Sequence, residues 1–151
     1  MPFVSLTRLR IRSFFYLPQF VWHAVKSGRL AERSPGFLGG RIMREARNAF
    51  WTITSWENDA TMNAYRTQGA HRDAMPNLLN WCDEASVAHW TQESRELTSW
   101  QEVHLRLAKE SRPSKVRHPS PAHLAQQFPL PCATRAERPL RPAISSSESS
   151  V

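Results

Sequence analysis

The segment from Asn48 to Trp90 constrains the fold more than any other part of the chain. It begins with aromatic and β-branched residues over 49–56, a composition typical of a β-strand whose side chains alternate between two faces. Tryptophan occurs on both faces, with Phe50, Thr52, Thr54 and Trp56 on one and Trp51, Ile53 and Ser55 on the other. We therefore expect both faces to be covered, one by helices and the other by a second layer.

The residues after this strand predict a helix, a second helical piece and another strand. Asn58 or Asp59 can cap the first helix, and Gly69 can end it. The second helical piece is expected over about 70–81 and the strand over about 85–91.

The part of the chain before this segment predicts a strand, a helix and a second strand. Apolar and basic residues alternate in the stretch 3–11, the period-two pattern of a half-buried strand. Apolar residues then recur at helical spacing from Leu17, and a strand over about 37–45 contains Gly39-Gly40, which indicates a bulge or a close backbone approach. The order β-α-β-β-α-β predicts an α+β, ferredoxin-like sheet with helices on one face.

The region after this unit changes in composition. Ser99 and Glu102 form a capping-box pattern that predicts one more helix over 99–110. Seven of the eleven prolines follow residue 110, and the chain closes with serines. We predict one domain over 1–110, an extended but docked segment over 111–130, and a disordered tail over 131–151. Docking of the middle segment is expected from its apolar residues Val116, Leu124 and Phe128.

Charge and cysteine content narrow the class of protein. The net charge is +7, but residues 111–151 hold six basic and two acidic groups, so much of the charge lies after the predicted domain. That tail has few aromatic residues, so nucleic-acid binding is not expected. Cys82 and Cys132 form no disulfide framework, which favours a cytoplasmic protein. The apolar run 14–25 is too short and polar to span a membrane, so no membrane association is expected.

A family resemblance rests on four groups of residues, within a match that covers about residues 3–92. These groups are 50–57, which read Phe-Trp-Thr-Ile-Thr-Ser-Trp-Glu, Met62 with Tyr65, the segment Gly69-Ala70-His71-Arg72, and 35–40 before the second strand. They resemble the antibiotic biosynthesis monooxygenase-like superfamily of dimeric α/β barrels. The order of elements is also distantly similar to that of spheroidene monooxygenase-type proteins.

The resemblance implies a homodimer and a pocket. A four-stranded sheet with helices on one face leaves its other face bare, and two such faces packed together would close a barrel. In this superfamily the ligand pocket of each subunit lies between its own sheet and helices. The resemblance therefore implies a monooxygenase-like protein that acts on a hydrophobic or aromatic small molecule.

Candidate site residues follow from the same resemblance. His71 and Arg72 are the predicted catalytic residues; the resemblance implies for His71 a base, a hydrogen-bond donor or acceptor, or a haem ligand, whereas the alternative for both is an ordinary polar surface position. The predicted ligand-binding residues are Trp51, Trp56, Tyr65, Trp81 and His89, for which a place in the core is the alternative.

The expected cofactor chemistry separates two functions. The members that form quinones need neither metal nor flavin, so no cofactor is expected. Haem bound through His71 is the alternative, although Met75 stands where haem-degrading members have a histidine. The alternative function is a non-catalytic small-molecule or haem-binding protein of the same fold.

Overall fold

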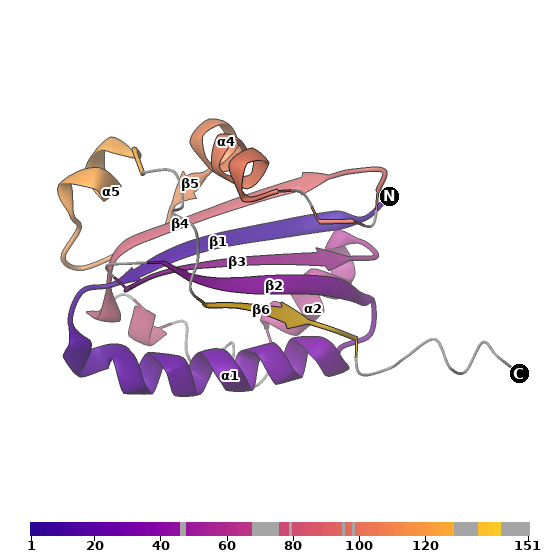
Figure 1. The fold of residues 1–151 in the computed structure, drawn as a ribbon, viewed down its shortest axis with the longest axis horizontal. Helices are drawn as coiled ribbons and strands as arrows, with labels where there is room; N and C mark the ends of the chain where they lie inside the picture. The colour runs from indigo at the N-terminus through magenta and orange to yellow at the C-terminus, as the bar shows by residue number, and fades with distance from the viewer. Residues whose placement is uncertain are drawn as a thin grey trace, which may run out of the picture.

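The computed structural model describes residues 1–45, 48–67, 76–78, 80–94, 96–97, 99–128 and 136–142. These residues form one antiparallel sheet with strand order β5-β4-β1-β3-β2-β6. Helices α1 and α2 lie on one face of the sheet, and α4 lies on the other (Figure 1). The predicted α+β, ferredoxin-like fold is confirmed.

The predicted order of elements is found in the structure. The strands are β1 (Phe3–Ile11), β2 (Phe37–Glu45), β3 (Ala49–Trp56), β4 (Cys82–Thr91), β5 (Arg112–Pro113) and β6 (Ala136–Leu140). The helices are the short 3-10 helix η1 (Phe14–Tyr16), α1 (Leu17–Arg33), α2 (Asp59–Arg66), α4 (Trp100–Glu110) and α5 (Pro121–Ala125). Residues 76–78 and 80–81 are also helical.

Local side-chain chemistry sets two of the helix starts. The Asn58 side chain accepts a hydrogen bond from the Thr61 backbone N–H at 2.9 Å, and the Thr61 side chain accepts one from the Asn58 N–H. Ser99 caps α4 by accepting from the Glu102 N–H at 3.3 Å. Each cap satisfies a backbone donor that the first helical turn leaves without a partner.

The paired glycines of β2 form the predicted bulge. The register against β3 shifts between Phe37 and Gly39, and Gly39 has a φ of 152°, which few side chains tolerate. A Cβ atom at Gly40 would lie 2.6 Å from the Ile53 carbonyl oxygen, so the backbones approach too closely for any larger residue.

The face opposite α1 is covered within the same chain. Helix α4 packs there through Val103 and Leu107, both buried, and Trp100 lies edge-on to Trp51 at 6.5 Å. The remaining members of this core come from the four central strands: Val4, Leu6, Met43, Ile53, Ala88 and Trp90. The second layer predicted from β3 therefore exists, but α4 supplies it, and the expectation of a bare face awaiting a partner subunit is corrected.

The described part of the C-terminal region contains helix and strand that its composition does not indicate. Val116 and Phe128 pack against the sheet as expected, but Leu124 is 72% exposed and lies on α5, inside a segment predicted to be extended. Ala136–Leu140, in the stretch predicted to be disordered, form β6 alongside β2 (Figure 1). Pairing with an open strand edge provides main-chain hydrogen bonds that a count of apolar residues does not reveal.

None of the helices in the described ranges is long and apolar enough to cross a membrane.

Candidate functional site

A cavity of about 390 Å³ lies between the sheet and helices α1 and α2. Its floor is the sheet face formed by alternate residues of the central strands, listed here in chain order: Ser5, Thr7, Leu9, Ile42, Phe50, Thr52, Thr54, Ala85, Val87 and His89. Its roof comes mainly from α1, α2 and the residues just before β4, including Phe20, His23, Ala24, Ser27, Gly28, Ala31, Met62, Tyr65, Arg66, Leu78 and Trp81.

The cavity exists because small side chains face each other across the two layers. At the centre of the floor Thr7 pairs with Thr52 on one side and with Val87 on the other. The roof above contributes Gly28 and other small residues of α1. Short side chains on both the floor and the roof leave space between the two layers. On the opposite face of the sheet, large side chains fill the corresponding space.

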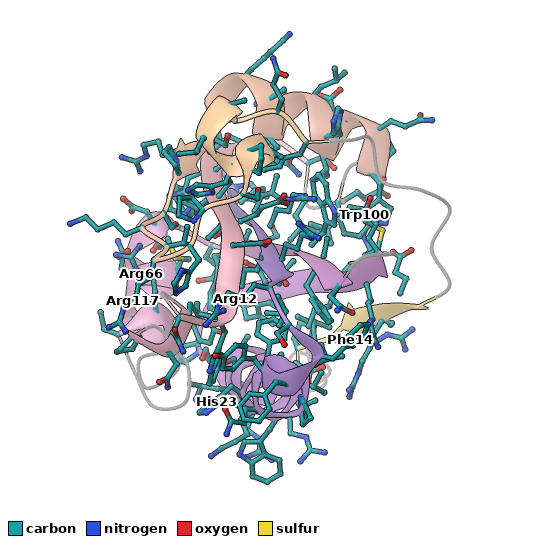
Figure 2. The ribbon with its side chains drawn as sticks, turned by 90° about the vertical axis from the view of Figure 1, so that its left-hand side faces the viewer. Arg12, Phe14, His23, Arg66, Trp100 and Arg117 are labelled. Atoms are coloured by element: carbon teal, nitrogen blue, oxygen red, sulfur yellow. The ribbon has the colours of Figure 1, made fainter. Side chains whose placement is uncertain are left out.

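One end of the cavity is aromatic. Phe20 and Phe50 meet with ring centroids 4.7 Å apart, and His23 lies 5.5 Å from the Trp81 ring. The buried Nδ1 atom of His23 has no hydrogen-bond partner among the described residues. His23, which Figure 2 shows on α1, lines the cavity beside this apolar wall.

The other end carries Tyr65, Arg66 and His89. The Tyr65 hydroxyl donates to the Ser27 carbonyl oxygen at 3.1 Å, and burial raises the pKa of Tyr65 well above its usual value, so the phenol stays protonated. Burial, together with the positive charges of Arg66 and Arg112, lowers the pKa of His89. His89 is therefore neutral at pH 7 and able to accept a proton.

The structure separates the predicted ligand-binding residues into three groups. Tyr65, Trp81 and His89 line the cavity. Trp56 is buried on the same sheet face, stacked on Tyr65 at 5.0 Å, but it does not line the cavity. Trp51 lies on the opposite face, fully buried beneath α4, and its indole N–H donates to Glu45 at 2.6 Å.

The assignment of Trp51 to the ligand site is therefore corrected: strand alternation directs its side chain into the other core. The predicted catalytic residues His71 and Arg72 lie outside the described residues, as does Met75.

His23 is the cavity residue that sequence reasoning missed. It follows Phe20 by three positions and precedes Ser27 by four, so helical spacing places all three on one face of α1. This helical spacing could have identified His23 from the sequence. A histidine on the apolar face of a helix that covers a sheet points into the space between the helix and the sheet.

Two kinds of chemistry find no support among the described residues. No group of three or more His, Cys, Asp or Glu side chains within them could hold a metal ion. Burial and the neighbouring Asp83 raise the pKa of Cys82 to about 12, so its thiol is not a nucleophile at neutral pH.

Comparison with known proteins gives similarity at the level of the fold. The chain matches no protein-family model and no curated protein. Among solved structures it is similar to SnoaB, a cofactor-independent oxygenase from Streptomyces nogalater, with a TM-score of 0.51 and 15% identity over 62% of this chain and 94% of that one.

Two other solved structures give the same result. An antibiotic biosynthesis monooxygenase superposes with a TM-score of 0.54 and 9% identity, over 61% of this chain and 99% of its own. A conserved protein from Methanosarcina mazei Go1 gives 0.55 and 8%, over 62% and 94%. At these identities the likeness shows a shared fold, an antiparallel ferredoxin-like sheet with helices, and nothing beyond the fold.

Proposed function

We propose that this chain is a monooxygenase-like protein that binds a hydrophobic or aromatic small molecule in the cavity between the sheet and helices α1 and α2. The observation that carries the proposal is the cavity itself, a partly open, largely apolar space with two imidazoles in its wall. Its volume of about 390 Å³ falls within the range of ordinary small-molecule sites, so one molecule of a few fused rings would fill it.

The side chains suit an aromatic guest. Phe20, Phe50 and Trp81 offer ring faces at one end, and the hydroxyl groups of Thr7 and Thr52 offer hydrogen bonds from the floor. Aromatic pairs contribute on the order of 0.5–1.5 kcal/mol beyond area burial, so a planar ligand is favoured over an aliphatic one of equal size.

The reaction that fits these residues is oxygenation of an activated ring carbon. A ring CH₂ group and O₂ yield C=O and water, and the first step is removal of an acidic proton from the substrate. Neutral His89 is the proposed base, because its lowered pKa keeps it unprotonated and the neighbouring arginines favour the anion that proton loss creates. The buried Tyr65 phenol stays protonated and is a donor rather than a base.

Three sequence-based expectations remain part of the proposal. His71 and Arg72 are retained as second candidates for catalysis, cofactor-free chemistry is retained, and the link to spheroidene monooxygenase-type proteins is retained as a resemblance. An interface for the predicted homodimer at the face opposite α1 is not retained, because α4 covers that face.

Oxygen uptake with an anthrone as probe substrate tests the proposal. We expect catalysed uptake in the purified chain and a loss of about 100-fold or more in His89→Gln, the usual effect of removing a general base. His71→Gln and His23→Gln are measured in parallel, so that the base is identified among the three. His118→Gln, at an exposed position outside the cavity, is the matched control.

Three outcomes would overturn parts of this proposal. Anthrone binding without oxygen uptake would favour the non-catalytic binding protein, and a Soret band in the untagged protein would favour haem. Absence of any binding by aromatic compounds would contradict the assignment of the cavity as the functional site.

A further inference from the structure

The side of the cavity next to strand β5 carries a group of positive charges. Strand β5 pairs with β4 so that Arg112 lies directly opposite Val87, a residue of the cavity floor. Directly opposed residues in an antiparallel pair direct their side chains to the same face, so the Arg112 side chain leaves the sheet on the cavity side. His89, two residues along β4, occupies the diagonal position.

Two further cations complete the group. Arg66, the last residue of α2, and Lys115, three residues beyond Arg112, both line the cavity. The charges of Arg66 and Arg112 both lower the pKa of His89, which shows that they lie close enough to His89 to act on it. Figure 2 shows Arg66 on the left-hand side of the molecule, away from the exposed face of α1 at the bottom of the view.

Within the described ranges, no acidic side chain pairs with these charges. The described part of the chain contains no ion pair to Arg66, Arg112 or Lys115, and the residues that line the cavity include no Asp or Glu. Other basic residues differ in this respect: Arg8 pairs with Glu84 at 2.5 Å, and Arg106 pairs with Glu110 at 3.2 Å.

We infer that the ligand of this cavity is an amphipathic anion, an apolar ring system bearing an acidic oxygen group that Arg66, Arg112 and Lys115 hold at the β5 side. The inference rests on the proposed function and specifies its substrate class. The aromatic end then receives the apolar body, and the cationic side receives a carboxylate or similar group, since guanidinium and ammonium groups donate strong charge-assisted hydrogen bonds to such oxygens.

A pair of fluorescent probes that differ only in charge tests this inference. The anion 1-anilinonaphthalene-8-sulfonate and its neutral analogue N-phenyl-1-naphthylamine share one ring system. Both are titrated into the full chain, into the variant Arg66→Gln, Arg112→Gln, Lys115→Gln, and into the control Lys26→Gln, Arg29→Gln, Arg33→Gln. The control removes the same net charge from exposed positions of α1 that lie outside the cavity.

We expect the cavity variant to bind the anionic probe about tenfold more weakly, because it lacks three positive charges that attract the sulfonate group. Its affinity for the neutral probe should be unchanged, and the control should bind both probes as the wild type does. Added salt should weaken binding of the anion alone.

Three results would overturn the inference in different ways. Equal loss of the anion in the cavity variant and the control would show that net charge, not this site, attracts it, and the proposed function would stand. The wild type could also bind the two probes equally, with neither affinity changed in the cavity variant. That result would contradict the anionic group of the ligand, and the proposed function would again stand. Failure of both probes to bind would overturn the inference together with the cavity-based function.

Discussion

Adjacent residues of β1 have opposite surroundings, and this alternation separates the core from the cavity. Leu6 is fully buried beneath α4, whereas Thr7, the next residue, lies on the cavity floor. Arg8 returns to the α4 side, where it pairs with Glu84 and lies 4.4 Å from the Phe128 ring centroid. A one-residue slip of β1 would place Arg8 in the cavity and empty the core of Leu6.

The buried pair Arg8–Glu84 holds the C-terminal region against the sheet. Desolvation raises the pKa of Glu84, but hydrogen bonds from Arg8 and Ser120 outweigh it, and the net pKa is lowered. Ser120 donates to Glu84 at 2.8 Å just before α5, so the carboxylate joins β1, β4 and the start of that helix.

The titration of His89 gives a prediction at the scale of one residue. Its pKa lies below the ordinary histidine value of about 6.5, so the unfolded chain binds the proton more tightly than the folded one. His89 therefore contributes a stability that is present above the unfolded pKa and is lost as the pH falls toward the folded value. NMR titration of the imidazole should show the low pKa, and Arg66→Gln should raise it.

The matched control for that titration is Arg29→Gln, which changes a charge on the exposed side of α1. An unchanged His89 pKa in Arg66→Gln would contradict the placement of Arg66 beside His89.

At the scale of the element, α4 replaces what a partner subunit was expected to provide. Truncation of a buried leucine leaves a cavity as well as lost apolar contact, so Leu107→Ala should lower the free energy of unfolding by about 2–5 kcal/mol. Leu105, on the same helix but 51% exposed, provides the comparison, and Leu105→Ala should change stability by no more than about 0.5 kcal/mol. Urea denaturation followed by tryptophan emission measures both.

Equal effects of the two substitutions would show that α4 does not pack on the sheet through the Leu107 side.

The elements that sequence reasoning predicted correctly are those set by local chemistry. The alternation in β1 and β3, the Asn58 and Ser99 caps and the glycine bulge in β2 all depend on residues near each other in the chain. Other features depend on contacts between segments that are far apart in the chain: the docking of α4, the formation of β6 and the surroundings of Trp51. No local sequence pattern indicates which uncovered face or strand edge such a segment will contact. In the site, Tyr65, Trp81 and His89 were predicted as ligand-binding residues, and the structure places all three in the cavity wall. His23, which also lines the cavity, was missed.

At the scale of the whole molecule, the covered sheet face predicts that two copies do not associate through it. The core beneath α4 already buries Leu6, Trp51 and Ile53, so little apolar area remains there for a second copy. Chemical cross-linking at micromolar concentrations should not join two copies of the 17.4 kDa chain across this face. A stable dimer that cross-links from the α4 side of one copy to that of another would contradict this arrangement.

The two outermost strands, β5 and β6, affect whether the sheet edges of separate copies can pair with each other. Strand β5 is two residues long and includes Pro113, and β6 places Pro139 and Arg138 on the opposite border of the sheet (Figure 1). Proline has no amide hydrogen and charged side chains resist stacking, so neither border offers a complete row of donors to an incoming strand. The C-terminal region thus protects the sheet from edge-to-edge aggregation as well as covering one of its faces.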